Sequence, residues 1–576
     1  MDILDILLGR ALSPNTQADV AAKEAKAAAA EAKEIADSLE DIPNISVTYS
    51  NTSTQVSTTA DISTNNGTNQ ILYKNYKQSG DNEDGSMTQK AITAYVNSIA
   101  EGSGTGGSTN LGEENSGNIV VVGENGNIQS GSITEESIIQ TQLIAGTYTA
   151  EGTYGIKIDY ENKIFIFDQE NFISSNYFMR RCLVNNDGEI ICFQNDLNYE
   201  DDKSKNNYQT MVVISKFYYL RMPLRVGNDG SLKEEELIIS LTKKPGFKLH
   251  PAFINDAGEE VEYFLFSAYE GSGYNSSNGY NTNDSIINFN TDMLSSVAGV
   301  KPASGARQQF TIENAEKIAK KRGLGWHITS IKAISALQML GLIGCGSADL
   351  QTALGQGVTA ITNVGSSVNG SSLTGSTSNL VGDGIAEETI NENNGTYTTY
   401  TDENKCAVSF WGIENLWGNI WTMVGGIKII GYRTSNNSVR SYYAVCDSLD
   451  YTGRYIYLNY EPPTESDWIG SLGYDKNFDW VMLPASVGGN NKLPIGDYIW
   501  VGPRIGTNKV LYGGSWGHQD YAGLFTVALD TEYDATGRST NARLMFVPPI
   551  NQVYNTNINE INSLKELNDL PPIIAT

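Results

Sequence analysis

Tight-turn sequences set between short runs of strand-forming residues are the feature that most limits how this chain can fold. They recur as "NIVVVGENGNI", "CLVNNDGEIICF", "LRVGNDGSLKE" and "INDAGEEVEYF". Asn-Gly and Asp-Gly pairs accept the positive φ angles that two-residue hairpin turns need, and the flanking residues favour an extended chain. The pattern predicts hairpin-rich β structure, as a small β element over residues 111–145 and a large domain over residues 146–549.

Length and charge narrow the possible classes of protein. With 576 residues the chain is long enough for several domains. Its 39 Lys and Arg residues against 66 Asp and Glu residues give a formal charge of −27, which opposes binding to nucleic acid. No apolar run is long enough for a transmembrane helix, and the N-terminus lacks the basic start of a secretory signal. We therefore expect a protein that is made in a cytoplasm and is not inserted in a membrane.

The first 43 residues carry two predicted segments. Residues 1–12 are strongly apolar and are expected to dock on another protein. Residues 13–43 are predicted to form a helical coiled coil that ends at Pro43, because apolar residues follow a heptad spacing. The seam is formed by Ala18, Ala21, Ala25, Ala28, Ala32, Ile35, Leu39 and Ile42. A solvated alanine-rich helix is the alternative, since an alanine seam buries little apolar area.

The segments around the large domain have a different composition. Residues 44–110 are predicted to be a linker or thin shaft, because their Thr, Ser and Asn content does not supply a core. A short helix is expected over residues 86–100, and the glycine-rich stretch at 102–107 marks a domain boundary. Two prolines close the large domain, and residues 550–576 are predicted to be a C-terminal tail.

Five cysteines are too few and too scattered for a disulfide framework or a zinc site, so we expect buried free thiols. Cys182 and Cys192 flank the turn "NNDGE". A two-residue turn at Asp187 and Gly188 would pair residue 182 with residue 193 and point the two cysteines to opposite faces. A three-residue turn would set them opposite one another. The sequence leaves both registers open.

Patterns typical of catalysis and metal binding are missing from the sequence. His250, His327 and His518 lack the spacing of metal ligands, and no P-loop, nucleophile elbow or dinucleotide-binding motif occurs. A calcium-dependent sugar site is not supported either, since "NYEPPTESDW" lacks the second half of that pattern. We expect no catalytic residue, no metal and no cofactor, and therefore a protein that is not an enzyme.

Three motifs near the C-terminus resemble a known family. Together, "ENLWGNIWTMVGG", "VLYGGSW" and "NARLMFVP" resemble the C-type lectin-like fold of formylglycine-generating-enzyme relatives and of the target proteins of diversity-generating retroelements. Upstream stretches such as "MVVISKFYYLRM" and "GWHITSIKAISALQML" are similar to the version found in phage tail and fibre proteins of gut bacteria. The resemblance covers residues 146–549, about 70% of the chain. It implies a multidomain protein with an N-terminal α-helical coiled coil, a β-rich neck and a C-terminal α+β C-type lectin-like domain.

The enzyme branch of that family depends on cysteines that follow the Gly-Gly-Ser motif and bind copper. Here Trp516 is followed by Gly517, His518 and Gln519, and no cysteine occurs after Cys446. The oxidase activity is therefore not carried over to this chain.

The other branch displays side chains on a stable frame between the Gly-Gly motif and the closing Ala-Arg-Leu. In "LYGGSWGHQDYAGLFTVALD", Phe525, Val527 and Leu529 would face inward, and Thr526, Ala528 and Asp530 outward. The resemblance assigns the frame to Trp417, Gly418, Asn419, Trp421, Gly513, Gly514, Phe525, Val527, Leu529, Ala542, Arg543 and Leu544. It assigns ligand contact to Trp516, His518, Gln519, Asp520, Tyr521, Thr526, Tyr533, Asp534 and Arg538. An ordinary polar loop is the alternative for the exposed residues.

The resemblance implies a phage tail or fibre adhesin located on the virion. Residues 1–12 would attach it to a tail, baseplate or capsid protein, and three copies would assemble. Its partner would be a glycan or a protein on a bacterial surface, because aromatic side chains beside polar groups suit either ligand. Two alternatives remain: a structural fibre or decoration protein that binds no receptor, and an unusual oxidase of the formylglycine-generating type.

Overall fold

The structure is a computed structural model of the chain. It describes residues 44–51, 55–64, 67–76, 86–87, 120–122, 128–130 and 153–549. Within the last range it does not describe residues 168–178, 201–207, 276, 278, 281–283, 285, 394, 447, 449–450 and 503–504. The chain divides into two compact units, Met1–Ser132 and Ile133–Thr576.

The first unit contains two small sheets. One has the order β1 (Asn44–Asn51), β2 (Gln55–Thr64), β3 (Gly67–Tyr76), β4 (Ser86–Met87), and the other pairs β5 (Val120–Val122) with β6 (Ile128–Ser130). Three long paired strands thus lie where the sequence predicted a linker or shaft, since threonine and other β-branched residues favour extended chain. The helix predicted over residues 86–100 does not begin at Ser86, which is part of β4. Residues 88–100 lie outside the described residues.

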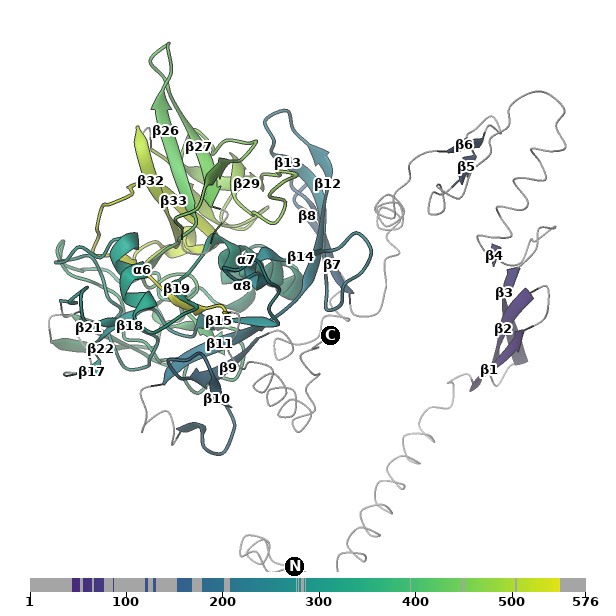
Figure 1. Cartoon of the computed structure of the whole chain (residues 1–576), viewed down its shortest axis with the longest axis horizontal. Helices are drawn as coiled ribbons and strands as arrows, with labels where there is room; N and C mark the ends of the chain where they lie inside the picture. The colour runs from purple at the N-terminus through teal and green to yellow at the C-terminus, as the bar shows by residue number, and fades with distance from the viewer. Residues whose placement is uncertain are drawn as a thin grey trace, which may run out of the picture. The chain divides into compact units, whose positions relative to one another are not determined.

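The second unit is built on three large sheets (Figure 1). The six-stranded sheet has the order β10 (Ile190–Phe193), β9 (Met179–Val184), β11 (Gln209–Ser215), β15 (Tyr263–Ser267), β35 (Leu544–Phe546), β19 (Trp326–Ile328). The five-stranded sheet has the order β14 (Lys248–Leu249), β12 (Tyr218–Val226), β13 (Leu232–Ser240), β7 (Thr153–Asp159), β8 (Ile164–Phe167).

The ten-stranded sheet contains most of the C-terminal third of the described chain. Its main path is β28 (Tyr455–Tyr457), β27 (Val439–Cys446), β26 (Ile427–Arg433), β32 (Gly506–Gly513), β33 (Gly523–Glu532), β31 (Tyr498–Trp500), β29 (Asp467–Leu472), β30 (Pro484–Val487). Off this path, β25 (Trp421–Met423) pairs with both β32 and β34 (Thr540–Asn541).

Smaller elements complete the unit. One short sheet has the order β17 (Gly279–Tyr280), β16 (Ser272–Asn275), β18 (Met293–Ser295). A second has the order β20 (Gly384–Ile385), β23 (Val408–Phe410), β24 (Ile413–Glu414). A third pairs β21 (Thr389–Asn393) with β22 (Thr396–Tyr400). The α-helices are α6 (Ile312–Lys320), α7 (Ile331–Cys345) and α8 (Leu350–Leu354), and the 3-10 helices are η2 (Pro251–Phe253), η3 (Glu403–Lys405) and η4 (Gln519–Tyr521).

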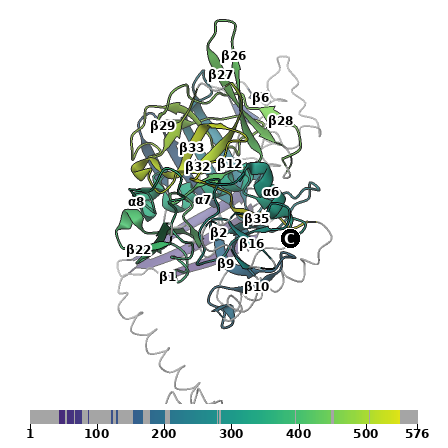
Figure 2. The ribbon, with the colours of Figure 1, turned by 90° about the vertical axis from the view of Figure 1, so that its left-hand side faces the viewer.

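Helix α7 lies at the centre of the second unit, between the ten-stranded and six-stranded sheets (Figures 1 and 2). Ser330 caps its N-terminus by accepting a hydrogen bond from the Ala333 amide at 3.1 Å. The helix is apolar around almost its whole circumference, and Leu337 and Leu340 are fully buried in the main core. Among the described residues, no helix combines the length and the apolar character needed to span a bilayer.

The fold class predicted from the sequence is wrong. The described residues are predominantly β, with three α-helices among them, and do not form an α+β domain behind a helical coiled coil. The prediction relied on family motifs for the large domain, whereas the frequent tight turns join short strands into sheets throughout it. The coiled-coil segment 13–43, the docking segment 1–12 and the tail 550–576 lie outside the described residues.

The β9–β10 hairpin decides between the two cysteine registers. Next to the turn, Val184 pairs with Ile190 and the Asn185 amide donates to the Glu189 carbonyl, as a three-residue turn requires. A β-bulge between Ile190 and Cys192 then shifts the register, so that Leu183 pairs with Cys192 and Cys182 pairs with Phe193. The two thiols therefore point to opposite faces of the sheet and cannot form a disulfide with each other. None of the five cysteines, all of which lie within the described residues, forms a disulfide; Cys345 is half-buried and the others are buried.

Candidate functional site

Six aromatic rings from four parts of the chain meet in one cluster. They are Trp421 of β25, Trp468 of β29, Tyr498 and Trp500 of β31, and His518 and Tyr521 of the loop between β32 and β33. Strand pairing brings them together, because β31 lies between β29 and β33, and β25 pairs with β32. We call this cluster the aromatic face.

At its inner end, three rings form a compact triangle. The centroids of Trp421 and Trp500 are 5.5 Å apart, and His518 lies 5.0 Å from each of them. All three pairs meet edge to face, the arrangement that aromatic quadrupoles favour. Beside this triangle lies a cavity of about 290 Å³, here called the aromatic cavity. Its lining residues are Trp421, Trp500, Leu511, His518, Ala528, Asp530, Thr531, Thr536, Gly537, Ser539 and Thr540.

The outer end of the aromatic face is open to solvent. Tyr521 stacks on Trp468 at 5.1 Å with an interplanar angle of 28°, and Tyr498 meets both rings edge to face. Trp468 and Tyr498 are direct partners across the antiparallel β29–β31 pair, which fixes their distance. Tyr521 remains 43% exposed although it touches three other rings.

His518 is an uncharged member of the cluster. Its Nδ1 accepts hydrogen bonds from the Ser515 amide at 3.0 Å and from the Ser515 hydroxyl at 2.9 Å. Burial among the rings lowers the pKa of His518 to about 4, so the imidazole is neutral at neutral pH. Because Nδ1 is an acceptor, the proton of the neutral ring resides on Nε2, which is therefore a hydrogen-bond donor.

The loop that carries His518 and Tyr521 is anchored where β33 begins. Asp497 is fully buried there and accepts a hydrogen bond from the Phe525 amide at 2.6 Å. The two chains approach so closely that a Cβ atom at Gly523 would lie 1.8 Å from the Asp497 carboxylate. Glycine is thus required at residue 523, and burial raises the pKa of Asp497 well above its usual value.

Two of the residues predicted to face a ligand are buried instead. Trp516 is 4% exposed and packs in a small core with Ile361 and Ile420. Thr526 is fully buried, and its hydroxyl donates to the Tyr521 carbonyl. The predicted alternation failed because β33 is a central strand that is covered on both faces from residue 523 to residue 529.

The other predicted ligand-facing residues are at least partly accessible. His518 and Tyr521 belong to the aromatic face, whereas Gln519, Asp520 and Asp534 are exposed beside it, and Tyr533 and Arg538 are half-buried. Asp520 accepts hydrogen bonds from the Gln356 amide at 2.9 Å and from the Asn491 amide at 3.1 Å. Arg538 donates to two backbone carbonyls of residues 365 and 368, so its guanidinium is already engaged.

The residues predicted to form the frame are all buried. Gly513 and Gly514 have φ angles of 92° and 84°, which other residues rarely adopt. Asn419 donates to Glu270 at 2.9 Å and accepts from the Ser372 amide at 2.7 Å. The remaining frame residues are Trp417, Gly418, Trp421, Phe525, Val527, Leu529, Ala542, Arg543 and Leu544. Trp421 belongs both to the frame and to the site, because its ring also lines the aromatic cavity.

Several residues of this site are not indicated by the sequence motifs. Trp468, Tyr498 and Trp500 precede the Gly-Gly motif, and Asp530 is expected on the outward side of its strand without a ligand role. The available signal was the spacing of Tyr498 and Trp500, since residues two apart in a strand share a face. The local sequence does not indicate that Trp468 is their partner, because it does not determine which strands pair.

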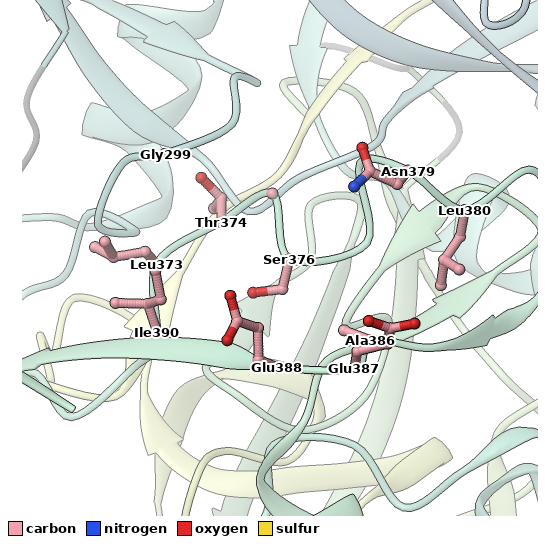
Figure 3. A pocket seen from close by; sticks show the side chains of 11 residues that line it. Gly299, Leu373, Thr374, Ser376, Asn379, Leu380, Ala386, Glu387, Glu388 and Ile390 are labelled. Carbon is pink, nitrogen blue, oxygen red and sulfur yellow. The ribbon is translucent and has the colours of Figure 1, made fainter. Parts of the chain in front are cut away.

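A second cavity, of about 510 Å³, lies elsewhere in the same unit and contains no aromatic ring. We call it the carboxylate cavity. Figure 3 shows Glu387 and Glu388 on one segment and Ser376 and Asn379 on the facing loop. Its other lining residues are Gly299, Leu373, Thr374, Gly375, Leu380, Ala386 and Ile390.

Buried side chains form hydrogen bonds to the backbone of the loop around residues 375–377, which lines the carboxylate cavity. Glu414 accepts hydrogen bonds from the amides of Gly375 and Thr377, each at 2.7 Å, and from the Thr377 hydroxyl. Burial, together with the nearby Glu270, raises the pKa of Glu414 to about 7. Arg181 donates to the Thr377 carbonyl at 2.9 Å. The backbone of the loop is therefore fixed by ionisable side chains.

Comparison with known proteins gives structural similarity alone. No protein-family model matches the chain, and no curated protein matches it. Among solved structures, it is similar to the Major Tropism Determinant P3c variant at 10% identity and a TM-score of 0.20, over 69% of this chain and 72% of that one. The I1 variant gives 10% identity and a TM-score of 0.21, over 70% of this chain and 82% of that one. The M1 variant gives 10% identity and a TM-score of 0.21, over 70% of this chain and 83% of that one.

Proposed function

We propose that this protein is a receptor-binding protein of a phage tail or fibre, and that its aromatic face contacts the bacterial surface. The observation that supports this most is the unbroken cluster of six rings, at whose outer end Tyr521 is 43% exposed. Clustered, partly exposed aromatic side chains are typical of binding surfaces, because each ring supplies a large contact area and tyrosine adds a polar group.

The rigidity of the cluster adds to its capacity for binding. Trp468, Tyr498 and Tyr521 restrain one another by stacking and edge-to-face contacts with centroids 4.7 to 5.5 Å apart. A side chain that is already ordered loses little conformational entropy when a ligand binds. The outer end of the face is therefore preorganised.

We propose binding without catalysis. The aromatic face offers ring surfaces, hydroxyl groups, a neutral imidazole and the Asp530 carboxylate, which together suit recognition of a ligand. In this proposal residues 1–12 attach the protein to a tail, baseplate or capsid protein of the virion. Three copies would present three faces at once, so that individually weak contacts combine through effective concentration.

The test is adsorption of the labelled full chain to a panel of bacterial strains. We expect binding to at least one strain, and a loss of at least about tenfold in the Trp468→Ala, Tyr521→Ala double variant, because truncating hot-spot aromatics typically costs more than about 1 kcal/mol each. Tyr397→Ala is the matched control, since Tyr397 is a 66% exposed tyrosine outside the aromatic face.

The outcomes separate adhesion from a structural role. Loss of binding in the double variant, with an unfolding temperature within a few degrees of the parent, supports the proposal. If no strain in the panel binds the parent protein, the chain is a structural component and the proposal fails. Equal binding by the double variant and the control would exclude the aromatic face as the contact.

A further inference from the structure

We infer that the aromatic cavity holds an uncharged sugar ring of a bacterial surface glycan. This inference rests on the proposed function, because it specifies which chemical group of the receptor enters the site. It follows from three properties of the cavity: its size, its combination of apolar and polar lining residues, and its charge.

The size of the cavity suits one small cyclic group. Its volume of about 290 Å³ is at the lower end of ligand pockets, which begin at roughly 300 Å³. A terminal or branch sugar can enter such a cavity while the rest of the glycan continues over the aromatic face. Tyr498 and Tyr521 extend the aromatic surface beyond Trp500, at centroid distances of 4.7 and 5.9 Å.

The walls of the cavity match the two kinds of surface on a sugar. A pyranose ring has an apolar C–H face and a rim of hydroxyl groups. The rings of Trp421 and Trp500 and the side chain of Leu511 supply the apolar wall. The polar wall is formed by Asp530, Thr531, Thr536, Ser539 and Thr540.

Donors and acceptors are both available for hydroxyl groups. The Asp530 carboxylate is half-buried and can accept hydrogen bonds from two adjacent hydroxyls. The Nε2 proton of His518 is a donor, because Nδ1 accepts from Ser515. A hydroxyl group both donates and accepts, so it can use either partner, whereas an aliphatic side chain of a protein receptor would leave both unsatisfied.

The charge of the cavity favours neutral sugars over acidic ones. None of its described lining residues is a lysine or arginine, and Asp530 contributes a negative charge. The formal charge of the chain, −27, acts in the same direction at longer range. Uronic acids, sialic acids and phosphorylated sugars are therefore disfavoured.

Selective destruction of one receptor class tests the inference. Cells of a binding strain are treated with periodate, which cleaves vicinal diols of sugars, or with a broad-specificity protease. We expect periodate to abolish adsorption of the full chain and protease to leave it unchanged. Adsorption that survives periodate but not protease would overturn the sugar inference and leave the adhesin proposal standing. Absence of adsorption to untreated cells would instead refute the adhesin proposal itself.

Substitution inside the cavity tests the location. Asp530→Asn removes the charge but keeps the size of the side chain, and should weaken adsorption about tenfold, the effect of losing hydrogen bonds to a charged group. Glu387→Gln is the matched control, because Glu387 is an exposed carboxylate in the carboxylate cavity. At least one of galactose, mannose and N-acetylglucosamine should compete with the cells, and glucuronate should not. Adsorption of Asp530→Asn equal to that of Glu387→Gln would overturn the assignment to this cavity.

Discussion

The aromatic cavity and the carboxylate cavity belong to the same unit but are constructed in different ways. The first is walled by side chains of paired strands, whose rings hold one another edge to face. The second is walled by a loop whose backbone is tied to buried Glu414 and Arg181. The smaller cavity has the more specific chemistry, because its rings, carboxylate and imidazole converge, whereas the larger one presents mainly exposed carboxylates and aliphatic side chains.

The difference shows that volume alone does not identify a binding site. Apolar surface and a few convergent polar groups increase the affinity of a site for its ligand. Each charge that the ligand leaves buried without a partner lowers that affinity, because the charge loses its hydration. Of the two cavities, the aromatic cavity meets both requirements. Three variants test the structural supports of the two cavities, in order of decreasing expected effect at neutral pH.

Removing the support of the carboxylate cavity should have the largest effect. Glu414→Ala leaves the amides of Gly375 and Thr377 and the Thr377 hydroxyl without their acceptor, at a cost of about 1 to 3 kcal/mol for each buried group. Thermal unfolding measures this loss. Adsorption to cells, measured well below the unfolding temperature, should stay at the parental level. Loss of adsorption by the folded variant would show that the two cavities are coupled.

Crowding the anchor of the aromatic loop should have an intermediate effect. Gly523→Ala forces a Cβ atom against Asp497 and should destabilise the protein by about 1 to 3 kcal/mol. Adsorption should fall as well, because Tyr521 lies two residues away. Gly517→Ala in the same loop is the control, since the nearest atom to its Cβ is 4.0 Å away. Equal stability of the two variants would contradict the close approach.

Protonating the aromatic triangle should have the smallest effect near neutral pH, because it acts only in acid. The pKa of His518 is lowered to about 4 in the folded protein, against 6.5 for an unfolded histidine. The unfolded chain therefore binds more protons between these values, so the stability from neutral His518 is complete above pH 6.5 and declines as the pH falls toward about 4. Unfolding temperatures of parent and His518→Gln, compared across this range, should converge at the acidic end. A constant difference at all pH values would show that His518 keeps an ordinary pKa.

Part of this architecture could be predicted from the sequence, and the successes are local. The turn predicted around Asp187 and Gly188 joins β9 to β10, although a β-bulge beyond it sets the register of the cysteines. The positive φ angles of Gly513 and Gly514 agree with the role assigned to the Gly-Gly motif. Such features depend on a few neighbouring residues, whose conformational preferences are strong.

The failures are non-local. Thr526 alternates with apolar residues, yet it is buried because neighbouring strands and loops cover both faces of β33. Trp468 joins Tyr521 across a separation of 53 positions that no periodicity indicates. The site is assembled by strand order, which depends on the packing of the whole unit. For the same reason, family motifs did not show that the described chain is predominantly β.

The buried cysteines have a consequence for the behaviour of the protein in an oxidising medium. Burial raises the pKa of Cys182 far above that of a free thiol and that of Cys345 to about 12, which suppresses the thiolate forms that oxidants attack. Cys182 and Cys192 are also held on opposite faces of a hairpin, where air cannot crosslink them. The protein can therefore pass from a reducing to an oxygenated medium without forming a disulfide between Cys182 and Cys192.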